Sequence, residues 1–174
     1  RIGISVGHGR PYPLPLDLLV GVDGQKARFL ENLKRFACHL PANHALLWGV
    51  RGTGKSSLAK AAFMAVAADH PALKLIEVDR DEVAALPPLF DRLRGRPERF
   101  VVLCDDLSFE DGAAAAKALK SALEGGVAGP PENVLFDIRT GQSWCEPDRI
   151  ATRHYDVAVT SGADVVKAPY IAET

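Results

Sequence analysis

The sequence lacks a hydrophobic run long enough to cross a membrane, and its first residues do not form a signal peptide. It also has few cysteines. Cys38, Cys104 and Cys145 form an odd, widely spaced set, which argues against a disulfide framework and indicates a reducing compartment. The histidines show no metal-ligand spacing with one another or with these cysteines. We therefore expect a cytoplasmic protein with no membrane partner.

The sequence also lacks a strong excess of positive or negative charge. The net charge is -1 over 174 residues, so charge does not support binding to nucleic acid. The length is that of about one domain. A composition of 47% hydrophobic and 25% charged residues is typical of a globular chain with a single core. Length and composition therefore predict one folded domain.

What the sequence does contain is a P-loop pattern, G-x-x-x-x-G-K-S, from Gly49 to Ser56. Glycines in such a loop allow its backbone N–H groups to converge on phosphate oxygens. Lys55 would reach the β and γ oxygens of a nucleotide, and Ser56 would offer its hydroxyl to Mg²⁺. The predicted nucleotide contacts are Gly49, Val50, Arg51, Gly52, Thr53, Gly54, Lys55, Ser56 and Ser57.

The residues on either side provide the context that this motif requires. Ala45–Trp48 is a short apolar run that predicts a buried strand, and Ser57–Ala68, rich in alanine, predicts a helix. A glycine-rich turn that ends in Lys-Ser by chance is the competing interpretation. The order of strand, loop and helix disfavours it.

A Walker B pattern follows later, where the apolar run Phe100–Cys104 ends in Asp105 and Asp106. The carboxyl end of a buried parallel strand opens into the ligand crevice, so Asp105 would lie beside the Mg²⁺ and complement Ser56. Asp106 would polarise the attacking water, a role that a glutamate often has. The competing interpretation is a strand end that turns into a loop, where aspartate is common.

The remaining segments complete an alternating order of helices and strands. Helices are predicted at about Gln25–Leu40, Asp81–Arg94 and Ala113–Glu124, and strands at Leu73–Val78 and Asn133–Phe136. Residues 1–17 are rich in proline and glycine and predict an extended arm.

Several sequence blocks are more specific than the P-loop. They are LLWGVRGTGKSS at Leu46–Ser57, LIEVD at Leu75–Asp79, LRGRPERF at Leu93–Phe100, CDDLSFE at Cys104–Glu110 and ALKSALEGGV at Ala118–Val127. With these blocks, residues 17–136 resemble the bacterial AAA+ ATPases of the domain-of-unknown-function 815 family.

The resemblance implies an α/β, three-layer P-loop NTPase of the ASCE (AAA+) type, with a parallel sheet of order 5-1-4-3-2 and with ATP and Mg²⁺ as ligands. It divides the chain into an arm at 1–17, an ATPase core at 18–136 and a divergent tail at 137–174. It also implies that Val20 and Gly21 contact the adenine ring. A hydrophobic anchor for the next helix explains this apolar turn equally well.

After Phe136 the resemblance is lost. The fourth strand of the family ends in a polar sensor residue, but the spacing here favours neither Thr140 nor Gln142, and no arginine finger or helical lid is recognised. A shifted reading frame near Asp137, a divergent truncated member and residues joined across a gap are the three explanations, and the abrupt change favours the first. Tyr155–Thr160 still predicts a fifth strand.

Two functions are compatible with these patterns. The first is an AAA+ ATPase in which Lys55, Mg²⁺ and Asp106 stabilise phosphoryl transfer to water, in a homo-oligomer that acts on an unknown protein client. The second is a nucleotide-gated binding module with little hydrolysis, because the sensor and lid are missing. A small-molecule kinase also uses a P-loop, but the Asp-Asp strand end followed by an alanine-rich helix disfavours it.

Overall fold

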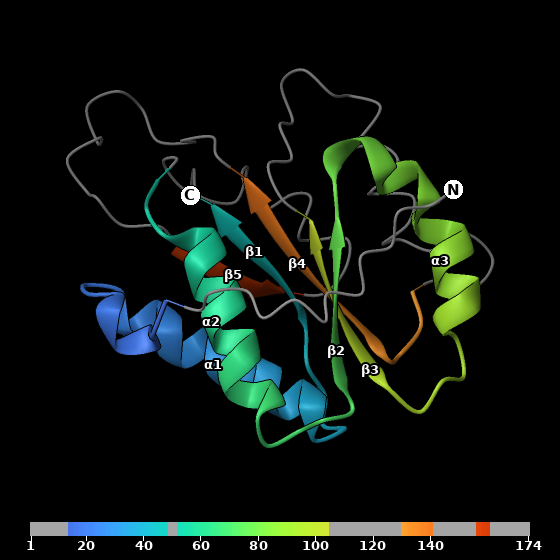
Figure 1. The fold of residues 1–174 in the computed structure, drawn as a ribbon, viewed down its shortest axis with the longest axis horizontal. Helices are drawn as coiled ribbons and strands as arrows, with labels where there is room; N and C mark the ends of the chain where they lie inside the picture. The colour runs from blue at the N-terminus through green and yellow to red at the C-terminus, as the bar shows by residue number, and fades with distance from the viewer. Residues whose placement is uncertain (1–13, 49–51, 105–129, 141–155, 161–174) are drawn as a thin grey trace.

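The structure, a computed structural model, is a five-stranded sheet with helices on both faces, and it describes residues 14–48, 52–104, 130–140 and 156–160 (Figure 1). The strands are β1 (His44–Trp48), β2 (Leu73–Val78), β3 (Arg99–Cys104), β4 (Val134–Thr140) and β5 (Asp156–Thr160). The helices are α1 (Asp23–Ala37), α2 (Lys55–Ala67) and α3 (Leu86–Leu93), with 3-10 turns η1 (Leu16–Leu18) and η2 (Arg80–Ala85).

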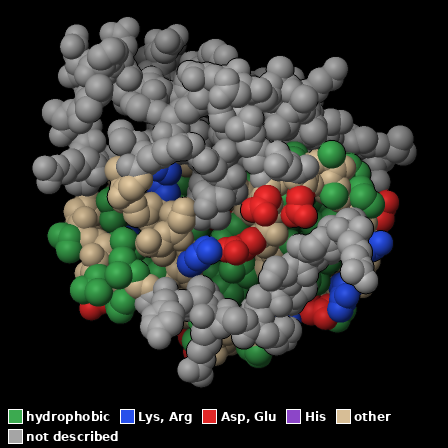
Figure 2. All heavy atoms as spheres, turned by 45° about the horizontal axis from the view of Figure 1, so that its top comes forward, with side chains coloured by type: hydrophobic (Ala, Val, Ile, Leu, Met, Phe, Trp, Pro, Cys, Tyr) green, Lys and Arg blue, Asp and Glu red, His purple; other side chains and the backbone are tan. Residues whose placement is uncertain are grey.

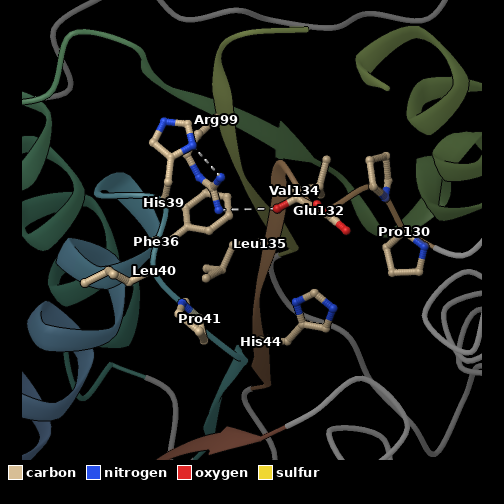
Figure 3. A pocket seen from close by; sticks show the side chains of 12 residues that line it. Phe36, His39, Leu40, Pro41, His44, Arg99, Pro130, Glu132, Val134 and Leu135 are labelled. Carbon is tan, nitrogen blue, oxygen red and sulfur yellow. Dashed lines mark hydrogen bonds between the residues drawn. The ribbon is translucent and has the colours of Figure 1, made fainter. Parts of the chain in front are cut away.

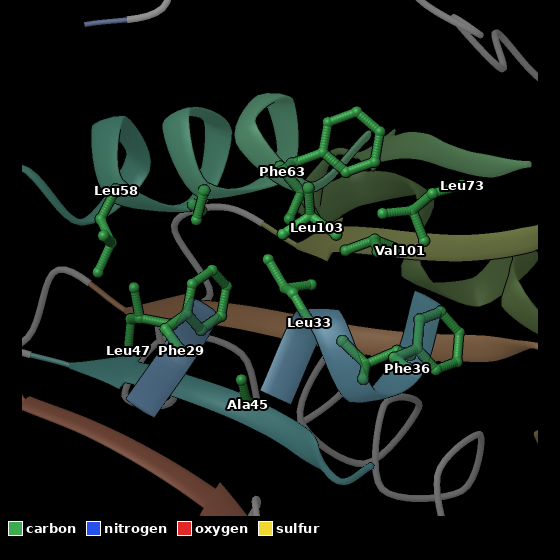
Figure 4. Close-up of a cluster of buried hydrophobic side chains, with 14 of the residues drawn as sticks. Phe29, Leu33, Phe36, Ala45, Leu47, Leu58, Phe63, Leu73, Val101 and Leu103 are labelled. Atoms are coloured by element: carbon green, nitrogen blue, oxygen red, sulfur yellow. The ribbon is translucent and has the colours of Figure 1, made fainter. Parts of the chain in front are cut away.

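Both faces of the sheet are buried, which explains why the central strand sequences are almost continuously hydrophobic. Side chains of β3 alternate between the faces: Val101 and Leu103 pack with α1 and α2, whereas Phe100 and Val102 pack with α3. Figure 4 shows the first cluster, in which side chains of both helices meet those of the strands. This arrangement confirms the predicted three-layer α/β fold.

Strands β2, β3, β4 and β1 are parallel and lie in the predicted order 1-4-3-2. Strand β5 lies beside β1 but runs antiparallel to it, with Ala158 opposite Leu46, so the expectation of a fully parallel sheet is wrong at this edge. A parallel fifth strand would require the chain to return along the whole sheet after β4. An antiparallel strand begins at the edge where β4 ends.

Strand β4 continues to Thr140, so the expected end at Phe136 is wrong. Asp137 lies within the strand, in register with Ala45 of β1 and Leu103 of β3, and it is fully buried. A carboxylate interrupts the hydrophobic run that marks the strand in the sequence. The backbone ladder continues past it, because main-chain pairing does not depend on the side chain.

The start of α3 and the end of α1 differ from the predicted helix boundaries. Helix α3 begins at Leu86 with prolines in its first turn, where a missing N–H costs no hydrogen bond. Helix α1 ends at Ala37, before the expected Leu40. The backbone N–H of Leu40 donates to the carbonyl of Arg35 at 2.9 Å, and His39 between them has φ of 59°. This is the Schellman arrangement, which turns the chain out of the helix.

Several predicted features lie outside the described residues. They are most of the arm at 1–17, the carboxylates Asp105 and Asp106, the helix Ala113–Glu124 and most of the tail with its predicted lack of a lid. Within the described ranges, no helix has both the length and the hydropathy of a membrane span.

His44 links the start of β1 to β4. Its Nδ1 accepts the backbone N–H of Phe136 at 3.2 Å, and its ring lies edge-to-face with the Phe136 ring at a centroid distance of 5.3 Å. Burial lowers the pKa of His44 from 6.5 to about 4. The imidazole is therefore neutral in the folded protein at neutral pH.

This burial predicts a specific pH dependence of stability. Between pH 6.5 and about 4, the unfolded chain binds a proton at His44 and the folded chain does not, so the free energy of unfolding falls as the pH is lowered through this window. At about pH 5 we expect a loss of about 2 kcal/mol relative to about pH 7.5, measured by urea unfolding. The variant His44→Asn keeps an acceptor oxygen and should lose less. An equal loss in both proteins would contradict the prediction.

Candidate nucleotide-binding site

The predicted P-loop joins β1 to α2, and the structure describes it from Gly52 onward; Gly49, Val50 and Arg51 lie outside the described residues. Gly52 has φ of 80° and Gly54 has φ of 94°. Both values lie in the left-handed region that residues with a Cβ rarely adopt. The loop conformation therefore requires glycine at these two positions.

Lys55 is the first residue of α2 and is only 7% exposed. Its Nζ donates to Oγ1 of Thr53 at 3.4 Å, which holds the ammonium group over the loop. Ser56 and Ser57 follow in the first turn of α2, both half-buried. The first N–H groups of this helix have no partner within the helix and so are suited to bind an anion.

Three strands end beside this loop at the carboxyl edge of the sheet. Trp48, the last residue of β1, is in register with Thr140 of β4, and Cys104, the last residue of β3, is in register with Ile138. The register therefore places Thr140 opposite Trp48, the residue that precedes the predicted P-loop.

The apolar turn before α1 lies against the P-loop. A Cβ added to Gly54 would be 3.3 Å from Cδ2 of Leu19, so Leu19 contacts the loop directly. Val20, the next residue, is 85% exposed, and Gly21 has φ of 82°. The two residues predicted to contact adenine therefore follow directly on a residue in contact with the P-loop.

Lys26 of α1 holds this turn in place, a role that the sequence did not reveal. Its Nζ donates to the carbonyl oxygens of Leu19 at 2.7 Å and Leu16 at 3.3 Å, and it forms an ion pair with Asp23 at 2.7 Å. A lysine in the first turn of an amphipathic helix has the sequence pattern of an ordinary surface residue. Only the fold shows what it contacts.

The described part of the site fits the phosphates of a nucleotide: glycines at positive φ, a buried lysine and a helix N-terminus meet in one loop. Mg²⁺ would be held by Ser56 and by Asp105, which directly follows β3. Elsewhere in the described part of the chain, no group of three or more His, Cys, Asp and Glu side chains is arranged to hold a metal ion.

Comparison with known families identifies the chain. The model of the family described as "Protein of unknown function (DUF815)" matches residues 5–142. The chain belongs to this family. The match extends beyond residues 17–136 at both ends and stops at residue 142, so most of the tail at 137–174 lies outside it.

Two solved structures are similar to this DUF815 member. The ORC1 protein of Aeropyrum pernix, in complex with DNA, has a TM-score of 0.56 and 18% identity over 75% of this chain and 40% of its own. PCH-2 of C. elegans has a TM-score of 0.49 and 18% identity over 70% and 38%. This chain thus spans about two fifths of these proteins. The first similarity shows that the two chains share a fold. No curated protein matches significantly.

The two loop glycines generate a prediction about stability. Gly52→Ala and Gly54→Ala should each destabilise the fold by about 1–2 kcal/mol, because alanine is strained at positive φ. Gly54→Ala should cost more, because its Cβ would crowd Leu19, whereas a Cβ on Gly52 would have nothing within 4 Å. Urea unfolding of the purified variants measures both losses.

Two further variants make this comparison specific. In a protein that already carries Leu19→Ala, Gly54→Ala should lower the free energy of unfolding by no more than Gly52→Ala does. Gly24→Ala, within α1 and with nothing within 4 Å of its added Cβ, should leave stability unchanged or raise it. Equal losses for Gly52→Ala and Gly54→Ala would show that Leu19 does not press on the P-loop.

Proposed function

We propose that this chain binds ATP with Mg²⁺ and hydrolyses it, and that hydrolysis drives a conformational change that acts on a protein client. One observation carries the proposal. The P-loop pattern coincides with a left-handed Gly54 and a buried Lys55 at the start of α2, on the carboxyl edge of a sheet with the AAA+ strand order. The family match and the AAA+-like fold support the same conclusion.

The proposed roles follow from position and charge. Lys55 would pair with the β and γ phosphate oxygens, and Ser56 with Asp105 would hold the Mg²⁺ that bridges them. Asp106 would polarise the attacking water. Thr140 would supply the polar group at the end of β4, because it is in register with Trp48, the residue before the P-loop pattern. These groups would act mainly by stabilising charge in the transition state.

The adenine ring would lie against the turn at Val20 and Gly21. Val20 is a large apolar side chain that is almost fully exposed, and covering it with a flat aromatic ring would bury apolar surface. Lys26 would keep the turn at the required distance by holding the carbonyl oxygens of Leu16 and Leu19. Lys26 would thus affect nucleotide affinity without touching the nucleotide.

The alternative is a nucleotide-gated module that binds ATP and hydrolyses it poorly. The position of Thr140 weakens the case for this alternative, because a polar residue does stand at the end of β4. We further propose that an arginine from a neighbouring copy completes the site, which would make hydrolysis depend on assembly. Binding and hydrolysis must therefore be measured separately.

The similar ORC1 structure contains DNA, but the charge of this chain does not support DNA binding. The net charge is -1, and among the described side chains on the face in Figure 2 acidic groups gather near the middle, with basic ones at separate places. A protein that binds DNA through phosphate contacts needs a continuous basic surface. We therefore propose a nucleotide and a protein client, not a nucleic acid, as partners.

Calorimetric titration with ATP and Mg²⁺, together with the hydrolysis rate per chain at increasing protein concentration, tests the proposal. Lys55→Ala should weaken ATP binding by at least about tenfold, since it removes a charge-assisted contact. Asp106→Asn should retain binding and lower the hydrolysis rate by about two to three orders of magnitude.

Lys60→Ala is the matched control, because Lys60 lies on the same helix and forms a partly exposed ion pair with Glu77. It should leave binding and hydrolysis unchanged. ATP binding without turnover at any protein concentration would favour the binding module. Unaltered ATP binding by Lys55→Ala would refute the proposed site.

A further inference from the structure

A second cleft lies at the opposite edge of the sheet, where the parallel strands begin. It has a volume of about 460 Å³ and is formed by the first residues of β1, β3 and β4, the end of α1 and the loop before β4. We call it the amino-edge cleft (Figure 3). Its lining includes Phe36, His39, His44, Arg99, Glu132 and Leu135. Nothing in the proposed ATPase function uses these residues.

Arg99 provides one fixed positive charge in this cleft. Its guanidinium carbon lies 4.1 Å from the centroid of the Phe36 ring, and its Nη2 donates to the backbone carbonyl of Glu132 at 3.3 Å. Its Nη1 lies 3.1 Å from Nδ1 of His39, which must accept because arginine only donates. The buried Nε–H has no hydrogen-bond partner among the described residues. Arg99 is thus oriented by three contacts.

His39, which contacts this arginine, has an unfavourable backbone conformation. Within the described ranges, His39 is the non-glycine residue with positive φ, and it occupies the position after α1 where the Schellman arrangement favours glycine. A residue with a Cβ is strained there. Glycine would end the helix more easily but would leave Nη1 of Arg99 without its partner. The imidazole of His39 therefore makes a contact with Arg99 that glycine at this position could not make.

His44 adds a neutral donor to the same cleft. Its Nδ1 accepts the backbone N–H of Phe136, and burial lowers its pKa to about 4. A neutral imidazole that accepts at Nδ1 carries its proton at Nε2. The lining also includes apolar residues, among them Leu40, Pro41 and Val134. The cleft thus combines a fixed cation, a neutral N–H donor and several apolar side chains.

We propose that the amino-edge cleft binds a small monocarboxylate with an apolar body, whose carboxylate pairs with Arg99 while the body packs against apolar side chains of the lining such as Leu40 and Val134. A planar guanidinium matches a carboxylate in shape and charge. The volume suits a small molecule, since ligand clefts of about 300 Å³ and upward are typical. The inference does not rest on nucleotide binding at the other edge.

The charges favour a monocarboxylate over phosphate. Arg99 is the cation that lines the described cleft, and the exposed Glu132 carboxylate lies on the same lining. A phosphate group carries nearly two negative charges at neutral pH and would be repelled more strongly by Glu132. Phosphate sites also present several converging donors.

The test is a titration of the ¹⁵N-labelled chain with 4-methylpentanoate, followed by NMR. We expect saturable shifts of the backbone amides of His39, Leu40 and Glu132 with a Kd of about 1 mM or tighter. The neutral isostere 4-methylpentanamide should bind at least about tenfold more weakly, because it lacks the charge that pairs with Arg99. Inorganic phosphate should cause no saturable shift of these amides.

Variants distinguish a loss of ligand binding in the cleft from a general effect on folding. Arg99→Gln should weaken binding of 4-methylpentanoate at least about tenfold. Arg28→Gln, an exposed arginine elsewhere on α1, should bind like the wild type. His39→Gly should bind several-fold more weakly while its urea unfolding midpoint stays unchanged or rises, which a purely structural role of His39 would not produce.

The proposal is overturned if 4-methylpentanoate causes no saturable shift, if the amide binds as tightly as the acid, or if phosphate binds more tightly than either. It is also overturned if Arg99→Gln or His39→Gly, each shown to be folded, binds the acid as the wild type does.

Discussion

The pairing of β4 between β1 and β3 is the constraint on which the rest of the structure depends. The three parallel strands are held in one register, and burial of both faces prevents any slip, since a shift by one residue would turn every side chain to the other face. Their carboxyl ends therefore meet at one edge of the sheet and their amino ends at the other. Each edge gathers residues that are distant in the sequence.

Helix α1 connects these two edges. Near its start, Lys26 holds the turn that carries Leu19 against the P-loop, and near its end Phe36 stacks on Arg99 in the amino-edge cleft. Between them, Phe29 and Leu33 are fully buried against the sheet and α2. Because α1 is buried in the core and contributes residues to both sites, the geometry of both sites depends on the same core. A loss of core packing should therefore disturb both edges together.

Much of the fold could be predicted from the sequence, because local patterns agree with it. Leu73–Val78 alternates and is a strand with those bounds, and the P-loop context identifies β1 and α2. The end of β4 could not be predicted, because Asp137 breaks the apolar run on which strand recognition rests. The direction of β5 could not be predicted either, since residue patterns are the same for parallel and antiparallel edge strands.

The two candidate sites also differ in how far they could be predicted from the sequence. The P-loop was recognisable because the phosphate cradle is built from consecutive residues, whereas Leu19 and Lys26 act through contacts that only the fold creates. In the amino-edge cleft, His39 and Arg99 are 60 positions apart, and no spacing rule links them. A site that the register assembles from strand ends leaves no motif in the sequence.

Backbone strain offers a physical way to compare the two sites. Gly54 takes a positive φ where a phosphate would have to approach the backbone, so the absence of a Cβ serves both conformation and access. His39 also takes a positive φ, yet it keeps a side chain that makes this conformation less favourable. The left-handed conformation at the P-loop thus leaves space for a ligand, whereas at the end of α1 it accompanies a side-chain contact. The imidazole of His39 makes a contact that glycine could not make, and that contact is with the arginine of the cleft.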